Sequence, residues 1–188
     1  SSEDLTRGEI FTREQSLKVL DICKRVSSAF ADAYVIFPTQ IGIRESRRIN
    51  GKAVLTGDDI VAGRKHHDAI ARSSYWVDIH CPLGRVTDHV HLCKSDCPTT
   101  LPCPMLDTQK AFLRDNLYPP QGEYYTIPYG AIVANDINNL LAAGRCISAD
   151  HEAIAAVRVM APCMATGQAA GIAGAIAAQT GTLPNALD

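Results

Sequence analysis

The stretch Asn139-Leu-Leu-Ala-Ala-Gly-Arg-Cys-Ile-Ser148 decides the fold expected for this chain. Its first half is a short apolar run that ends at Gly144, and such runs are typical of parallel strands buried on both faces. After a polar patch, residues 163–179 are rich in alanine and glycine and predict one long helix. An apolar run, a glycine turn and a helix aimed back at a ligand together predict an α/β fold.

The start of the long helix is the expected ligand-binding element. The first backbone N–H groups of a helix have no partner within it, and they lie at the positive end of the helix dipole. Such a start stabilises an anion. Glycine at position 144 carries no Cβ, so the backbone there can approach a bulky cofactor closely.

Further motifs follow in a fixed order along the chain. They are Ile41-Gly-Ile-Arg-Glu-Ser-Arg-Arg48, Leu55-Thr56 with Asp59, Asp68-Ala-Ile-Ala-Arg72, Asp78-Ile-His80, Arg158-Val-Met160 and Gly167-Gln-Ala-Ala-Gly171. Together with residues 139–148 they closely resemble the FAD-dependent oxidoreductase family over residues 5–80 and 123–180. The glycine spacing in residues 167–174 alone would also suit close packing of a helix. A single motif has a high false-positive rate, so the resemblance rests on the several motifs in order.

The resemblance implies an FAD cofactor and a redox reaction on an organic substrate. Residues 144–145 are expected near the ribityl and pyrophosphate groups, and residues 158–160 near the isoalloxazine ring. The helix that contains Gly167 is expected to begin under the pyrimidine edge of the ring, where a reduced flavin develops negative charge. The expected cofactor-binding residues are Arg44, Gly144, Arg145, Arg158, Val159, Met160 and Gly167.

One hallmark of the family is missing. Its members begin with a strand, a G-x-G-x-x-G turn and a helix, which hold the ADP half of the cofactor. That pattern does not occur in the 188 residues. We therefore expect the C-terminal portion of a flavoprotein that acts on a small organic substrate. The expected partners are that substrate and either the missing N-terminal half or a second copy of the chain.

The arginine-rich motif supplies candidate site residues. Alternation along an extended strand places Arg44, Ser46 and Arg48 on one face, and Glu45 and Arg47 on the other. In a functional interpretation, an arginine pair grips an anionic substrate or the flavin while the glutamate orients it. In a structural interpretation, these residues form partly solvated ion pairs worth ~0–1 kcal/mol each. Arg48 is a candidate catalytic residue.

Two histidines are candidates for proton transfer to a substrate held against the flavin. Histidine titrates near neutral pH, which suits His80 and His151 to this role. A lone histidine is more often a hydrogen-bonded structural residue. His151 is favoured because it lies closer to the expected flavin segment.

Bulk composition narrows the function classes. A net charge of -2 and the lack of a basic cluster argue against nucleic acid or an anionic membrane as partner. The long helix is interrupted by polar residues and is a poor membrane span. The polar N-terminus is not a signal peptide. An odd count of 7 cysteines excludes full intrachain pairing and favours a reducing compartment, with the cytoplasm as a weak expectation.

Two alternative functions stay open at this stage. A catalytically silent fragment would act by association through an exposed sheet edge. A small metal-binding module would use residues 80–103, where His91, Cys93, Cys97 and Cys103 offer zinc ligands at a spacing that fits no common finger.

The expected architecture has two parts. Residues 1–128 would form a substrate-side mixed sheet domain with helices, and residues 129–188 the C-terminal part of a Rossmann-like FAD-binding domain. The expected helices are residues 12–28, 56–63 and 163–179. The expected strands are residues 33–37, 74–80, 124–127 and 139–143.

Overall fold

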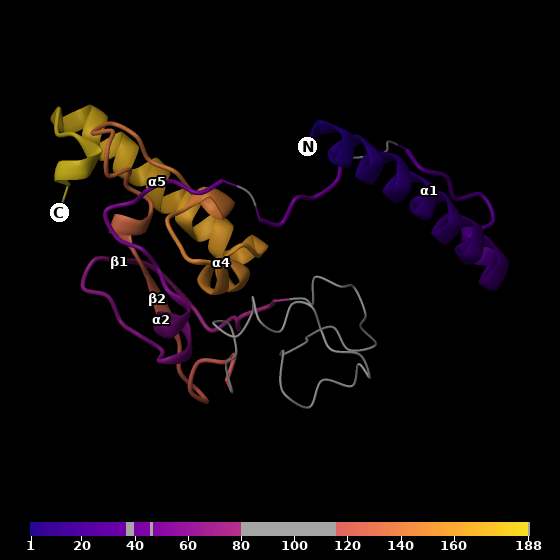
Figure 1. Cartoon of the computed structure of the whole chain (residues 1–188), viewed down its shortest axis with the longest axis horizontal. Coiled ribbons are helices and arrows are strands. Elements are labelled where there is room, and N and C mark those ends of the chain that lie inside the picture. Colours follow the sequence, from indigo (N-terminus) through magenta and orange to yellow (C-terminus); the bar gives the residue numbers. More distant parts are fainter. Residues whose placement is uncertain (37–39, 46, 80–115, 188) are drawn as a thin grey trace. The chain divides into compact units, whose positions relative to one another are not determined.

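A computed structural model describes residues 1–36, 40–45, 47–79 and 116–187 (Figure 1). The chain divides into two compact units, Ser1–Ile43 and Arg44–Asp188. The elements are α1 (Ser2–Val26), η1 (Ser28–Phe30), α2 (Gly57–Val61), β1 (Ala69–Ser73), β2 (Tyr125–Pro128), η3 (Tyr129–Ala131), η4 (Gly144–Cys146), α4 (His151–Val157), α5 (Met160–Thr180) and η5 (Pro184–Ala186), where η marks a 3-10 turn.

The first unit consists of α1 and the chain that follows it. Ser1 caps this helix in a capping box with Asp4, so the helix begins ten residues before the expected start. Thr12 does not cap it, because its hydroxyl donates to the Gly8 carbonyl inside the helix at 2.9 Å. The expected strand at 33–37 is wrong for its described residues 33–36, which have no strand partner. No residue of α1 is buried.

The core of the second unit is built on a two-stranded antiparallel sheet. In β1 and β2, Ala69 pairs with Pro128 and Ser73 with Tyr125. All four residues of β2 are buried, which confirms the strand expected at 124–127 within one residue. The strand expected at 74–80 is wrong for its described residues 74–79, because β2 begins at Tyr125 and offers no partner beyond Ser73.

The apolar run at 139–143 is not a regular strand, contrary to expectation. Leu141 forms one isolated antiparallel bridge with Val133, and Ala142 donates to the Ile132 carbonyl at 2.9 Å. Asn139 and Leu140 are exposed. The run pairs with the irregular segment after η3 rather than with parallel strands on both sides, so it is not buried on both faces.

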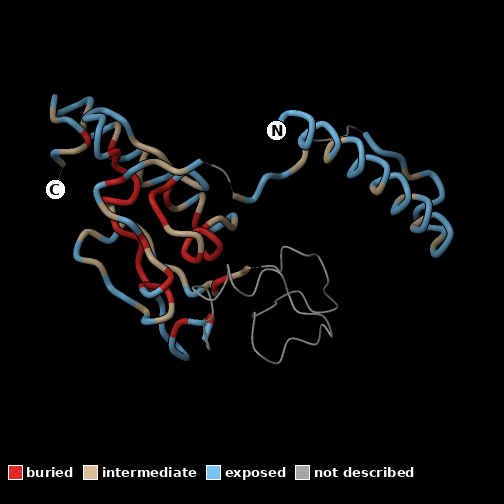
Figure 2. The backbone as a smooth tube through the Cα atoms, viewed as in Figure 1, coloured by how far each residue is buried: buried red, intermediate tan, exposed pale blue. Residues whose placement is uncertain are grey.

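Three helices complete this unit. Helix α2 packs against α4, and α5 lies along β1 (Figure 1). The α5 helix confirms the helix expected at 163–179 and extends three residues further toward the N-terminus. Residues 153–157 of α4 are buried, together with Leu55, Ile60 and Ile147, and form the centre of the core (Figure 2). Helices and strands are both present in this unit. The domain boundary expected between residues 128 and 129 stays a prediction.

Within the described ranges, no single helix combines the length and apolar character that a membrane span requires. The pair α4 and α5 passes that test only when joined across a bend of 92°.

Candidate functional site

The site is assembled where two of the sequence motifs meet. The backbone of Leu55 is bonded on both sides, donating to Ser148 at 3.1 Å and accepting from Asp150 at 2.9 Å. The Asp150 carboxylate then accepts the N–H of Gly57 at 2.9 Å and the N–H of Ala153 at 2.7 Å. One carboxylate therefore joins the starts of α2 and α4, which fixes the segment that leads into His151.

Close packing fixes the same contact. A Cβ built on Gly57 would lie 2.1 Å from Oε2 of Glu152 and 2.7 Å from its Cβ. These distances are far below ordinary van der Waals contact, so no larger residue fits at position 57 without movement. Gly57 is thus needed for the close approach of α2 to α4.

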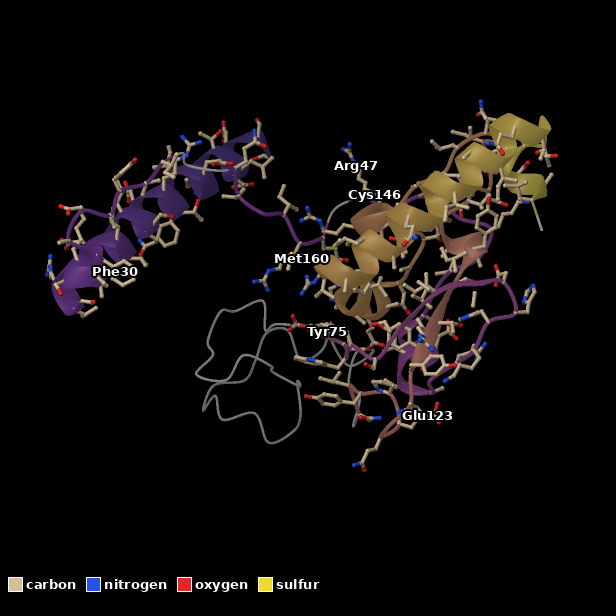
Figure 3. The ribbon with its side chains drawn as sticks, turned by 180° about the vertical axis from the view of Figure 1, so that it is seen from behind. Phe30, Arg47, Tyr75, Glu123, Cys146 and Met160 are labelled. Atoms are coloured by element: carbon tan, nitrogen blue, oxygen red, sulfur yellow. The ribbon has the colours of Figure 1, made fainter. Side chains whose placement is uncertain are left out.

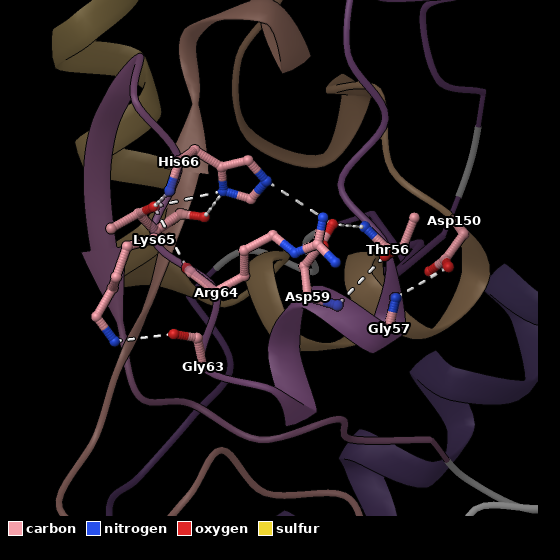
Figure 4. A network of polar contacts seen from close by, with 9 residues as sticks. Thr56, Gly57, Asp59, Gly63, Arg64, Lys65, His66 and Asp150 are labelled. Atoms are coloured by element: carbon pink, nitrogen blue, oxygen red, sulfur yellow. Dashed lines mark hydrogen bonds and ion pairs between the residues drawn. The ribbon is translucent and has the colours of Figure 1, made fainter.

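A polar network supports α2 from its other side (Figure 4). Asp59 accepts the N–H of Thr56 at 2.9 Å, and Thr56 accepts the N–H of Asp59 at 3.2 Å, which confirms the expected capping box. The buried Asp59 carboxylate also pairs with Arg64 at 2.8 Å. His66 approaches Asp59 at 3.9 Å and contacts the Thr126 carbonyl of β2 at 3.1 Å. The network links α2 to the sheet.

Glu45 brings the two described catalytic candidates together. Nδ1 of His151 lies 2.8 Å from one carboxylate oxygen of Glu45, and the guanidinium of Arg48 donates to the other at 2.6 Å. The expected alternation of faces is therefore wrong. Residues 44 and 45 lie in a bend, which turns Glu45 toward Arg48.

The charge state of Glu45 follows from these contacts. Burial by itself raises the pKa of its carboxyl group, but the hydrogen bonds and positive charges of His151 and Arg48 outweigh burial and lower the pKa below its ordinary value of 4.5. At neutral pH the group is an anion that only accepts hydrogen bonds. A neutral His151 therefore donates from Nδ1 to Glu45, and its Nε2 is the basic nitrogen.

An open cavity of about 590 Å³ adjoins this cluster. It is lined by Arg47, Arg48, Ile49, Asn50, Val54, Ser148 and Ala149. The side chain of Arg47 extends away from the backbone (Figure 3). A larger and mostly apolar groove of about 880 Å³ lies along α5 and β1, but none of the expected site residues line it.

The glycine turn is fastened to α5. Gly144 has a φ of 67°, in the left-handed region that favours glycine. Its N–H donates at 3.0 Å to the hydroxyl of Thr166, a side chain that is 1% exposed. Cys163 lies beside it, 3.6 Å from the place of a Cβ on Gly144, and burial raises the pKa of the Cys163 thiol despite the opposing charge of Arg145.

The start of α5 has no side-chain cap. Val159 occupies the N-cap position and makes no capping hydrogen bond. Met160, the first helical residue, is 83% exposed (Figure 3). The backbone N–H of Cys163 donates to the Val159 carbonyl at 3.1 Å, and this is the first helical hydrogen bond. Pro162 has no N–H, so the amides of Met160 and Ala161 are the donors that remain at the positive end of the helix.

The other expected residues fall in different places. Arg158 donates at 2.8 Å to the backbone carbonyl of Asp78, so it ties two motifs together inside the chain. Gly167 is exposed in α5, with nothing within 4 Å of the place of its Cβ. Arg44 and Arg145 are exposed. His80 and the metal-binding alternative at 80–103 lie outside the described residues, and the described ranges contain no group of three metal-ligating side chains.

Comparison with known proteins decides the family. The model of the family described as FAD dependent oxidoreductase matches residues 1–188. The chain belongs to the FAD-dependent oxidoreductase family. No curated protein and no solved structure matches the chain. The membership shows a flavoprotein oxidoreductase with FAD as its cofactor. The family suggests a Rossmann-like α/β fold, with which the helices and the two-stranded antiparallel sheet of the described residues are compatible.

The described residues fit part of an FAD site. The uncapped start of α5 offers backbone amides, the exposed Met160 offers an apolar side chain, and the left-handed Gly144 offers backbone without a Cβ. Two expected ligands are already engaged within the chain, since Gly144 donates to Thr166 and Arg158 to Asp78.

Three residues of the site were missed as site residues or given a different role by the sequence. Asp150 and Thr166 carry no motif of their own, because a helix cap and a hydroxyl in an alanine-rich helix are common. Glu45 was expected to orient a substrate, whereas it contacts His151 across 106 positions of sequence. A bend in the chain produces that contact, and alternation along a strand does not predict it.

Proposed function

We propose that this chain is the C-terminal portion of an FAD-dependent oxidoreductase of a small organic substrate, with His151 as the group that accepts or donates the substrate proton. One observation carries the proposal: His151 Nδ1 lies 2.8 Å from Glu45, which Arg48 holds at 2.6 Å. A histidine whose second nitrogen is fixed by a carboxylate has a defined tautomer and orientation, as general acid–base catalysis requires.

When bound, FAD supplies the transfer of a hydride or of electrons, and the protein supplies binding and orientation. The residues that would hold it are the first-turn amides of α5, Met160 and Arg145. Thr166 holds the Gly144 turn against α5 by accepting its N–H. Arg158 ties the Asp78 segment to the end of α4.

The ADP half of the cofactor requires a dinucleotide-binding segment outside these residues. The lack of G-x-G-x-x-G in the sequence supports this expectation. A protein that supplies that segment is thus the proposed partner, and FAD affinity is expected to rise when a dinucleotide-binding half is added in trans. Equal affinity with and without the added half would contradict the partner.

The proton-transfer role is tested by flavin reduction. The FAD-loaded protein is mixed without oxygen with a panel of small alcohols, amines and acids, and flavin absorbance is followed. His151→Gln is expected to slow reduction by about a hundredfold or more, as the loss of a general acid–base group does. The control is His67→Gln, because the His67 side chain is 97% exposed. Equal rates for His151→Gln and the wild type would overturn the role.

The tautomer provides a second readout that needs no substrate. Nitrogen NMR of labelled histidine is expected to show His151 protonated at Nδ1 in its neutral form. Glu45→Gln is expected to weaken that preference, since an amide is a poorer acceptor than a carboxylate. A neutral His151 protonated at Nε2 in the wild type would contradict the assigned orientation.

A further inference from the structure

The cavity beside the His151 cluster has a composition that the flavin site does not explain. It is a shallow hollow of about 590 Å³ that is widely open to solvent, and its polar lining comes from Arg47, Arg48, Asn50 and the buried Ser148. Its apolar lining is Ile49, Val54 and Ala149. A polar wall that faces a small apolar wall suits one small polar ligand.

The two arginines of this cavity differ in their electrostatic partners. Arg48 donates to Glu45, which offsets its charge. Arg47 is exposed and makes no ion pair or hydrogen bond among the residues that the structure describes. Residues 44–48 contain three arginines and one glutamate, a formal sum of +2. The side chain at the cavity that retains an unmatched positive charge is thus Arg47.

We infer that this cavity binds an organic carboxylate, and that Arg47 is the residue that recognises it. A guanidinium presents paired N–H donors that match the two oxygens of a carboxylate. Asn50 lies at the same wall, where its amide donates to the Asp136 carboxylate at 3.2 Å, and the apolar residues suit the carbon chain of the ligand. This proposal rests on the proposed function and names the substrate class of that site, an organic acid.

The position of the cavity connects recognition to chemistry. Arg48 lines the cavity and also holds Glu45, which contacts His151. Ala149 lines it two residues before His151, and Asp150 fixes the intervening backbone. A carboxylate bound at Arg47 would therefore anchor a substrate beside the proposed proton-transfer group.

Binding is tested by calorimetry with benzoate and its neutral analogue benzamide, on the FAD-loaded protein and on the protein alone. Benzoate is expected to bind at least tenfold more tightly than benzamide. Arg47→Ala is expected to abolish that difference, and Arg47→Lys to keep part of it because the charge remains. Arg7→Ala is the matched control: it removes the same charge from α1, where the side chain is 78% exposed.

The contrary outcomes are distinct. Equal affinity for benzoate and benzamide in the wild type, or undiminished benzoate binding by Arg47→Ala, would overturn the carboxylate site. If Arg47→Ala instead weakened FAD binding and left benzoate binding intact, the arginine would serve the FAD pyrophosphate, which also overturns the proposal. Failure of the His151 test with intact benzoate binding would refute the proton-transfer role alone, because calorimetry requires no turnover.

Discussion

Glu45 is the residue on which the local chemistry depends. It is half-buried, it accepts from Arg48, and it contacts His151. Its anionic form is favoured in the folded protein, as the lowered pKa shows. Removing the carboxylate therefore affects two neighbours at once, one cation and one histidine.

Glu45→Gln is expected to lower the free energy of unfolding by about 1 kcal/mol near neutral pH, the scale of a partly exposed charged hydrogen bond. The folded pKa lies below the unfolded value, so the carboxylate stabilises the protein above pH 4.5 and loses that effect as pH falls through the folded pKa. Denaturant unfolding of both proteins between pH 7 and pH 3 measures the difference. A difference that grows toward low pH would contradict this sign.

Gly57 tests close packing at the same junction. Gly57→Ala is expected to destabilise the protein by about 1–3 kcal/mol, because the added methyl group overlaps Glu152. Gly171→Ala is the matched control, since nothing lies within 4 Å of its Cβ position and alanine favours the helix by about 1 kcal/mol. Thermal melts compare the two. A Gly57→Ala protein as stable as the wild type would show that α2 and α4 are not in contact as described.

The contacts at this junction could not be predicted from the sequence. His151 and Arg48 are catalytic candidates because of their chemistry, and in the structure both contact Glu45. The faces assigned to residues 44–48 were wrong, because a bend at 44–45 replaces the extended strand on which alternation depends. Periodicity gives faces only where the backbone is regular.

Among the elements, α5 and the glycine turn form one assembly. Thr166 accepts the Gly144 N–H and donates to carbonyls one turn earlier in its own helix. A hydroxyl that both accepts and donates in a buried place is costly to replace by a methyl group. The Gly144 turn thus depends on Thr166, a residue of α5 that is distant from the turn in the sequence.

Thr166→Val is expected to destabilise the protein by about 1–2 kcal/mol, because the Gly144 amide loses its acceptor while the side-chain shape is kept. Thr166→Ser retains the hydroxyl and is expected to lose less. Denaturant unfolding of both variants measures the effect. Equal stability of Thr166→Val and the wild type would show that this hydrogen bond does not hold the turn.

Elements that carry their own local signal were predicted well. The capping box of Thr56 and Asp59 and the alanine-rich α5 both occur where expected. The strand at 139–143 was wrong, because a short apolar run gives strand character without saying which neighbour pairs with it. Here its neighbour is the irregular 132–134 segment. Pairing is a tertiary property that a local pattern does not contain.

For the whole molecule, family membership identifies the cofactor, and the individual residues determine how the chain could bind it. The order of several motifs predicted the FAD-dependent oxidoreductase family, and the family model matches the full 188 residues. The compact units divide at Ile43 and Arg44, a boundary that no motif marked. Motif order reports common ancestry, whereas compact units depend on contacts between distant residues.

The uncapped start of α5 is the feature on which the flavin assignment depends most. Met160→Pro removes the first amide of α5 and is compatible with the backbone, since proline favours this helix position and Val159 has a ψ of 161°. Met160→Ala removes the same exposed side chain and keeps the amide, so it is the matched control.

Titration with FAD, followed by flavin fluorescence and absorbance, compares these two variants with the wild type, each with a family dinucleotide-binding half supplied in trans. Wild type and Met160→Ala are expected to bind alike, and Met160→Pro about tenfold more weakly, the effect of one hydrogen bond. Equal binding by Met160→Pro, or no binding by the wild type, would contradict a flavin held at the start of α5.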